Sequence, residues 1–254
     1  MLRRIIAAGA VAMSIISGPA VADEANRHGV WDSLLETYVV ESDDGVNRFK
    51  YGALKNNAAD TAKLDAYLES FEALDFEKLS ENEQFAAYSN IYNALTIKHM
   101  IGRYPTKSIR SGYLMGPWKR VKTVVDGEEV SLDDIEHGIL REQFDDPRVH
   151  YAVNCASYGC PNLQNSAWEA ATLDEDLDKA ARDFINHPRG VQVRSRGGLQ
   201  VSQIYKWFRE DFGGSEQGVI DHLLKYANPV LAEDIKANAD IKKHEYDWSL
   251  NDAK

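Results

Sequence analysis

The segment Val149–Leu163 constrains the fold most tightly, because it places both cysteines of the chain in one short loop. An apolar run, Val149–Asn154, leads into this loop and predicts a strand. Cys155 ends the strand, and Cys160 precedes a proline in the turn that follows. Polar side chains at such a strand-to-loop junction are a common location for chemistry. We therefore expect the functional centre of the protein in this segment.

The first 22 residues have the pattern of a secretory signal peptide. Arg3 and Arg4 precede an uncharged apolar run, 5–16, and Ala20-Val21-Ala22 is a small-x-small cleavage site. The apolar run is too short to span a bilayer. We expect an exported, periplasmic protein, residues 23–254, without a membrane span.

The charge balance argues against nucleic acid as a partner. Without residues 1–22 the chain keeps 27 basic side chains against 40 acidic ones, a net charge of −13. Nucleic acid and anionic lipid repel such a protein. A chain of this length buries a sufficient core without disulfide staples. The two cysteines are therefore expected to form a single bridge or a functional thiol pair.

Apolar periodicity predicts a mixture of helices and hairpins. Capping patterns begin three of the helices, at Ser80, Ser131 and Thr172, and Asp126-Gly127 predicts a tight hairpin turn. The order is typical of a single α+β domain with a small, mostly antiparallel sheet. The expected helices cover about 24–38, 61–74, 80–102, 132–140, 172–184, 203–212, 219–226 and 230–237, and the expected strands 121–125, 128–130, 149–154, 191–194 and 199–202.

One interpretation of the loop is a cysteine-dependent acyl-transfer or amide- or thioester-hydrolysing enzyme. Cys155 would be the nucleophile, with His137 or His150 as base and Glu136 or Asn93 as the orienting group. If the strand prediction is right, His150 and Cys155 lie on opposite faces. His137, on the preceding short helix, is then the better placed base.

A second interpretation is a non-catalytic envelope binding or scaffold domain. Exported cysteines commonly pair, and a Cys155–Cys160 disulfide would fix a recognition loop. Arg148 and Lys206 would then hold an anionic group, and Ser157 lies in the same loop. Under either interpretation we expect a small-molecule or peptide-like ligand, and the sequence leaves the oligomeric state open.

A third interpretation is a structural zinc site, with His150, Cys155, Cys160 and His137 as ligands. The spacing is admissible for zinc but not diagnostic. The chain has no Walker loop, dinucleotide-binding glycine pattern, Gly-x-Ser-x-Gly elbow or His-Glu-x-x-His motif. We therefore expect no cofactor.

Three further polar side chains fall on apolar helix faces. Glu136 lies within the apolar arc of its helix, where a carboxylate is costly unless it is paired, and Arg148 or Arg141 is the expected partner. Asn90 and Asn93 are one turn apart on the long helix. Buried amides must be hydrogen-bonded. We expect the two amides to clamp the cysteine loop or to orient an imidazole or ligand.

Four motifs, in this order, resemble the family catalogued as domain of unknown function 547. They are Asn90-x-Tyr-Asn-Ala-Leu-Thr-Ile97, the segment Ser131–Arg141, the segment Asp146–Pro161, and the segment Val201–Phe212. The resemblance covers about residues 49–212, and the tail 246–251 is similar to that of bacterial members.

The resemblance leaves the activity open. It implies that the polar positions of the site are Glu136, His137, Arg148, His150, Cys155 and Ser157. An analogy to papain-like or transglutaminase-like thiol enzymes rests only on a cysteine near histidines in an α+β frame.

Overall fold

The computed structural model describes residues 19–253, with side chains from residue 27 onward. Most of the predicted signal peptide, residues 1–18, lies outside the described residues, and residues 19–22 form the start of the first helix. The signal peptide and export therefore stay predictions. Among residues 19–253 every helix is either too short or too polar to cross a lipid bilayer.

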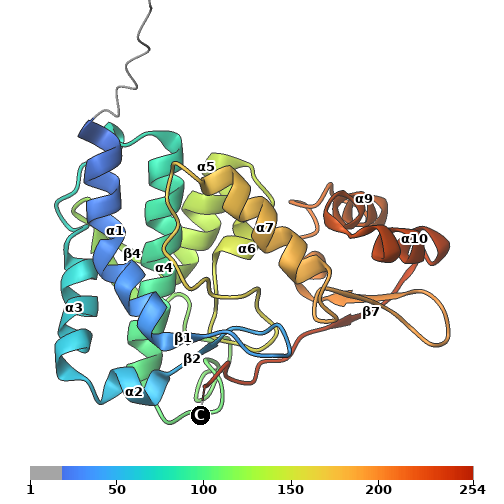
Figure 1. The fold of residues 1–254 in the computed structure, drawn as a ribbon, viewed down its shortest axis with the longest axis horizontal. Helices are drawn as coiled ribbons and strands as arrows, with labels where there is room; N and C mark the ends of the chain where they lie inside the picture. The colour runs from blue at the N-terminus through green and yellow to red at the C-terminus, as the bar shows by residue number, and fades with distance from the viewer. Residues whose placement is uncertain (1–18, 254) are drawn as a thin grey trace, which may run out of the picture.

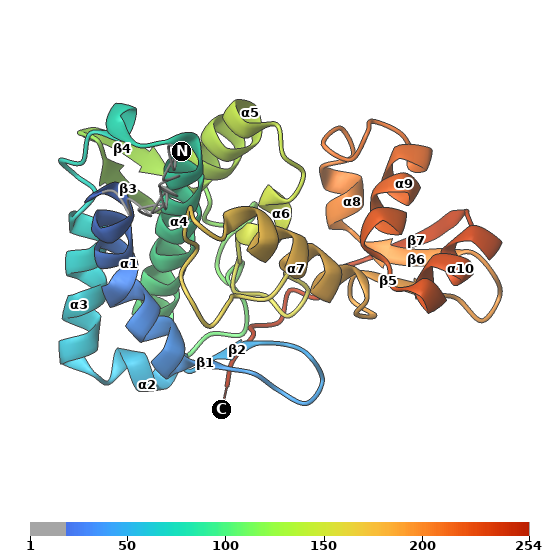
Figure 2. The same cartoon turned by 45° about the horizontal axis from the view of Figure 1, so that its top comes forward.

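The N-terminal half of the fold is built around α4 (Glu81–Arg103), which is buried along most of its length. Ser80 begins this helix with the predicted capping box, in which the side chains of Ser80 and Glu83 each accept a hydrogen bond from the other's backbone N–H. Helices α1 (Pro19–Tyr38) and α3 (Ala58–Glu69) pack beside it, as Figures 1 and 2 show. The short helix α2 (Tyr51–Lys55) joins this group.

A hairpin and a distorted helix follow α4. Strands β3 (Lys122–Val125) and β4 (Glu128–Ser131) are antiparallel, and both turn residues, Asp126 (φ 52°) and Gly127 (φ 77°), are left-handed. The predicted tight turn is thus confirmed. The next element, η2 (Asp134–Leu140), is a π-helix, a form that is frequent at functional sites. It continues into α5 (Arg141–Phe144).

The prediction of a strand at Val149–Asn154 is wrong, because Val149–Ala152 form the short helix α6. The Asp146 carboxylate starts this turn by accepting a hydrogen bond from the backbone N–H of Arg148 at 2.8 Å. A short apolar run is compatible with either a helix or a strand. A local hydrogen bond from the backbone to a side chain, as at Asp146, then decides between the two. Strand parity therefore does not set the positions of His150 and Cys155. The His150 side chain bonds to Asp211, and the Cys155 sulfur contacts Ser157 and Tyr246.

The C-terminal half carries the predicted second hairpin and short helices (Figure 2). The antiparallel pair β5 (Val191–Val193) and β6 (Leu199–Ser202) is extended by the parallel strand β7 (Ile241–Glu245). The expected single sheet is instead three small sheets, one of them mixed. The other elements are β1 (Val39–Val40), β2 (Arg48–Phe49), the 3-10 turn η1 (Phe76–Lys78), α7 (Leu173–Ile185), α8 (Ile204–Trp207), α9 (Glu216–Tyr226) and α10 (Pro229–Ala237).

The segment after β7 returns to the N-terminal half, where the chain ends near β1 and β2 (Figure 1). The Tyr51 hydroxyl donates a hydrogen bond to the Asn251 amide oxygen at 2.6 Å, and both residues are buried. The C-terminal tail therefore packs on the body of the domain. Because one continuous apolar core links the two halves, the described residues form a single α+β domain.

Candidate functional site

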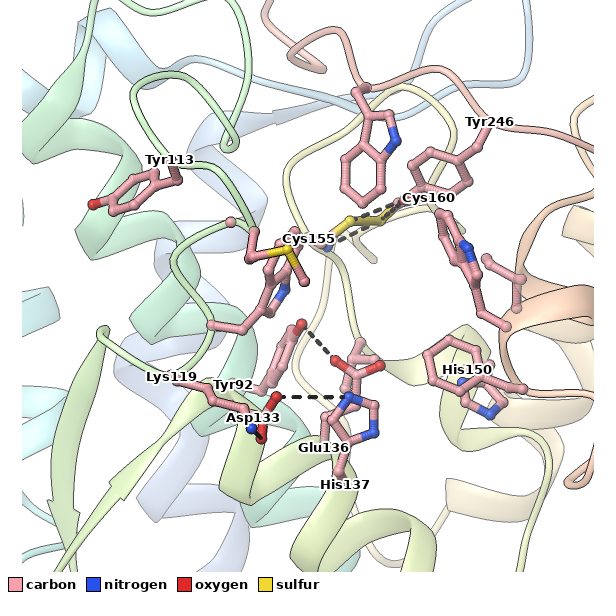
Figure 3. A pocket seen from close by; sticks show the side chains of 18 of the residues that line it. Tyr92, Tyr113, Lys119, Asp133, Glu136, His137, His150, Cys155, Cys160 and Tyr246 are labelled. Atoms are coloured by element: carbon pink, nitrogen blue, oxygen red, sulfur yellow. Dashed lines mark hydrogen bonds and ion pairs between the residues drawn. A yellow bond between two sulfur atoms is a disulfide. The ribbon is translucent and has the colours of Figure 1, made fainter.

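A cavity of about 740 Å³ lies between η2, the loop 112–120, the cysteine loop and the C-terminal tail. Its volume is in the range of small-molecule binding sites. Aromatic rings form much of its wall, and a few polar groups project into it (Figure 3). The aromatic lining residues are Tyr92, Tyr113, Trp118, Trp207, Phe208, Tyr246 and Trp248.

The two cysteines form one wall of this cavity as a pair at disulfide distance. Their Cα atoms lie 6.3 Å apart, and the backbone N–H of Cys155 donates to the Cys160 sulfur at 3.0 Å. The Tyr246 hydroxyl lies 3.0 Å from the Cys155 sulfur and 2.9 Å from the Cys160 sulfur. Burial raises the pKa of Tyr246, so its proton stays on and is donated to the bridge. The predicted pairing of Cys155 with Cys160 is confirmed.

Two buried asparagines of α4 bind the backbone of other segments through paired hydrogen bonds. The Asn93 side chain donates to the Ala152 carbonyl at 2.9 Å and accepts from the Asn154 N–H at 2.7 Å. Asn90 makes the corresponding two bonds with the backbone of Trp168. The predicted structural clamp is confirmed, and neither amide lines the cavity.

The rear of the cysteine loop is held by Arg189. Its guanidinium donates to the carbonyl oxygens of Tyr158 and Cys160, at 2.9 and 2.6 Å, and to the Asn162 side chain at 2.9 Å. Burial lowers the pKa of Arg189 to about 10, which still leaves the group charged at neutral pH. The loop is therefore fixed by charge-assisted bonds to its carbonyl groups.

Glu136 projects from η2 into the cavity and is only 8% exposed. The Tyr92 hydroxyl donates a hydrogen bond to Glu136 Oε2 at 2.8 Å (Figure 3). The predicted burial is confirmed, but the predicted ion pair with Arg148 or Arg141 is wrong. Arg148 is held by three aspartates near α7, and Arg141 by Asp211.

His150 is buried against Phe208, with 4.1 Å between the ring centroids. Burial lowers the pKa of His150 more than the hydrogen bond to the Asp211 carboxylate raises it. The neutral ring therefore donates from Nε2 to the Asp211 carboxylate, at 2.6 Å, and keeps a lone pair on Nδ1. Arg141 makes a bidentate pair with the same carboxylate at 2.6 and 2.7 Å, and donates to His137 Nδ1 at 3.0 Å.

The structure brings together only part of the predicted site. Glu136, His137, His150, Cys155 and Cys160 all line the cavity. The other predicted positions, Asn90, Asn93, Arg148, Ser157 and Lys206, are not among its lining residues.

Two of these outlying positions were expected to hold an anionic group. Lys206 is exposed on α8, whereas the Arg148 guanidinium is neutralised by carboxylates, so they do not form a common anion site. Ser157 is buried beneath the loop, with its hydroxyl 3.7 Å from the Cys155 sulfur. None of these five positions lies on the wall of this cavity, and their predicted substrate-binding roles stay predictions.

Several residues that line the cavity or contact its lining residues were missed because they come from distant segments. Tyr246 lies 91 residues from Cys155 and Asp211 lies 61 residues from His150. The density of aromatic residues in the tail was the one signal for Tyr246 and Trp248. Asp211 lies within the expected helix 203–212, and nothing in its local sequence indicates its partners.

No group of three or more His, Cys, Asp or Glu side chains arranged for a metal ion is found within residues 27–253. In this structure the two sulfur atoms pair with each other and so do not form the zinc site of the third interpretation.

The comparisons with known proteins identify the segment that carries this site. No curated protein and no solved structure matches the chain. The model of the family described as "Protein of unknown function, DUF547" matches residues 76–185, which contain α4, the first hairpin, η2, the cysteine loop and α7. Three of the four motifs lie in this range, and Val201–Phe212 lies beyond it. Residues 76–185 are thus similar to this family, which confirms the resemblance found in the sequence over that range.

Proposed function

We propose that the protein is exported to the periplasm and that its cavity binds a small-molecule or peptide-like ligand. The observation that carries this proposal is a cavity of about 740 Å³ with aromatic walls and one buried carboxylate, Glu136. Such a combination of apolar surface and few polar groups is typical of ligand sites. The N-terminal sequence pattern and the paired cysteines support export, because disulfides persist in oxidising compartments.

The cysteine pair supports binding rather than catalysis as the first function. A nucleophilic cysteine needs a free thiolate with a base within hydrogen-bond reach. Here the Cys155 sulfur is bonded to Cys160, and its hydrogen-bond contacts are with Tyr246 and Ser157 rather than with an imidazole. In the disulfide-bonded state the cysteine loop therefore forms a fixed part of the cavity wall.

The test is a ligand screen of amines, sugars, peptides and organic acids, read by tryptophan fluorescence and by melting temperature. Trp207 is 44% exposed, so Trp207→Ala leaves the core intact while removing part of the wall. Val230→Ala is the matched control, since Val230 is 75% exposed on α10, away from the cavity. A ligand that loses affinity only with Trp207→Ala supports the proposal. A screen without any ligand, or equal losses in both variants, contradicts it.

A second candidate is a cysteine-dependent acyl-transfer or amide- or thioester-hydrolysing enzyme. The specific observation in its favour is that Cys155, Glu136, His137 and His150 line one cavity. His150 also has the carboxylate partner that orients a catalytic base, although that partner is Asp211 rather than Glu136 or Asn93.

This activity requires an external thiol reductant, which opens the bridge and is itself oxidised to its disulfide. The Cys155 thiolate then adds to the substrate carbonyl, the amine or thiol leaves with a proton from the imidazolium, and water releases the acid. The test measures intact mass and iodoacetamide labelling with and without reductant. Activity on amide and thioester substrates is measured under the same two conditions. Activity after reduction that is lost in Cys155→Ala and kept in Cys160→Ala supports the enzyme. Full reduction without activity on any substrate leaves only the binding function.

A further inference from the structure

We infer that the cavity selects ligands in which a cationic amine is attached to an aromatic or apolar group, with Glu136 as the counter-charge of the amine. This inference rests on the proposed binding function and specifies the chemical class of the ligand.

The first step is that Glu136 has no cationic partner within residues 27–253. Glu136 is only 8% exposed as a residue, and its carboxylate accepts a hydrogen bond from the neutral Tyr92 hydroxyl. Burial raises the pKa of Tyr92, which keeps that hydroxyl protonated and in the donor role. A buried carboxylate that accepts a hydrogen bond from one neutral donor lacks most of the hydrogen bonds that water would provide. A buried charge therefore needs an oppositely charged partner to offset its desolvation.

The second step is that the nearby basic side chains either have a carboxylate partner or are exposed. Arg120, on the cavity wall, is exposed and lies over the Tyr113 ring, 5.8 Å from its centroid. The Arg141 guanidinium is bound bidentately to Asp211. Lys119 lies 3.6 Å from Asp133, and its side chain is 82% exposed at the cavity rim. The inner end of the cavity therefore keeps the unbalanced negative charge of Glu136, whereas the basic side chains lie at the mouth or are neutralised.

The third step is that the aromatic wall suits a cation with an apolar body. Tyr246 and Trp248 lie 4.5 Å apart between ring centroids, and Trp207 lies 5.0 Å from Tyr246. Figure 3 shows the Glu136 carboxyl group on the side of the cavity that faces Tyr246 and the cysteine pair, and Trp207 and Trp248 line the same cavity. Ring faces attract ammonium groups and stack on flat apolar groups. An anionic ligand would meet the carboxylate without a compensating cation, so it is disfavoured.

The experiment measures the affinities of three matched probes by isothermal titration and by tryptophan fluorescence. Tyramine carries a phenol ring and an ammonium group, 4-ethylphenol is its neutral analogue, and 3-(4-hydroxyphenyl)propanoate is its anionic analogue. We expect tyramine to bind about 10- to 100-fold more tightly than either analogue, because a charge-assisted hydrogen bond is formed only with the amine.

Two variants test whether the preference for tyramine depends on the charge of Glu136. Glu136→Gln keeps an oxygen that accepts from Tyr92 but removes the charge, so the preference for tyramine is expected to disappear. Glu128→Gln, an exposed position in the first hairpin, removes the same charge from the protein as a whole and should leave the preference unchanged. Circular dichroism and the melting temperature confirm that both variants fold.

The outcomes separate this inference from the binding function. Equal affinity for the three probes, or a preference for tyramine that survives in Glu136→Gln, overturns the amine inference. If a neutral or anionic ligand from the screen binds instead and depends on Trp207, the inference fails and the binding function stands. If tyramine binding is insensitive to both Glu136→Gln and Trp207→Ala, the cavity is not the site and both fail.

Discussion

The Nε2 atom of His150 donates a hydrogen bond to Oδ2 of Asp211 over 2.6 Å, and this contact joins α6 to the segment after α8. Arg141, at the end of η2, binds the same carboxylate with two bonds. Two neighbouring helical segments and a third segment, 61 residues beyond His150, therefore meet at one acidic side chain beside the cavity.

The first prediction is that Asp211→Asn lowers the free energy of unfolding by about 2–4 kcal/mol, because it leaves a half-buried guanidinium without its counter-charge. Urea unfolding at neutral pH measures the change. The control is Asp183→Asn, whose partner Lys179 lies on the exposed face of α7, with side chains 67% and 48% exposed for Lys179 and Asp183. That variant should lose no more than about 0.5 kcal/mol. Equal losses would mean that the Asp211 contacts contribute little.

The second prediction concerns the dependence of stability on pH. Burial, with a smaller effect of Lys225, lowers the pKa of His222 to about 4, and His28 and His99 are lowered to about 4 in the same direction. Between pH 4 and an unfolded pKa of about 6.5 the unfolded chain binds protons that the folded chain does not. Stability is therefore full above about pH 6.5 and falls as the pH drops towards 4.

Urea midpoints at pH 7.5 and pH 5 test this direction. His222→Phe removes one of the titrating groups and fills the same aromatic position beside Tyr151, whose hydroxyl keeps its contact with Tyr205. The variant should lose less stability than the parent between the two pH values. A parent protein that is more stable at pH 5 would contradict the sign.

The third prediction is that Asn93→Ala lowers the free energy of unfolding by about 2–4 kcal/mol. The substitution leaves a buried carbonyl at Ala152 and a buried N–H at Asn154 without partners. Asn82→Ala, an exposed position on the same helix, is the matched control and should be near neutral. Comparable effects of the two substitutions would remove the clamp role of Asn93.

These cases show which parts of the structure are readable from sequence. The capping box at Ser80 and the turn at Asp126 were predicted correctly because both signals lie within four residues. The burial of Glu136 followed from its position on the helix face. The partner of a buried polar side chain is not predictable in this way. His150 bonds to Asp211 across 61 residues of sequence, and several carboxylates are available to each arginine. Periodicity carries no information on that choice.

The strand prediction for the cysteine segment was wrong for another reason. Its apolar run is four to six residues long, and over that length a helix and a buried strand have the same composition. The aspartate that starts α6 decided the outcome through its own hydrogen bonds. The position of the site on the chain was therefore predictable, whereas the orientation of its side chains was not.

The fourth prediction is that a thiol reductant lowers the free energy of unfolding by about 2 kcal/mol, the value expected for closing a loop of about six residues. The mass of the protein should rise by two hydrogen atoms, and two thiols should become reactive. The double variant Cys155→Ser, Cys160→Ser is the control, since its stability should not respond to reductant. A parent protein with two reactive thiols before reduction would show that the pair is not bridged.

The fifth prediction concerns the loop 112–120 that forms the cavity wall. Gly116 has a φ of +83°, and a Cβ atom there would lie 1.5 Å from the Trp118 ring. Gly116→Ala must therefore displace this ring, which should weaken the binding of any ligand that depends on Trp207. Gly127→Ala is a matched control, because Gly127 has a φ of +77° and no atom within 4 Å of the added carbon. Both variants bear similar backbone strain, and Gly116→Ala adds the displacement of Trp118. Its melting temperature should therefore fall further, and only Gly116→Ala should alter ligand affinity and tryptophan fluorescence. If both variants bind ligand equally well, Trp118 is not part of the binding surface.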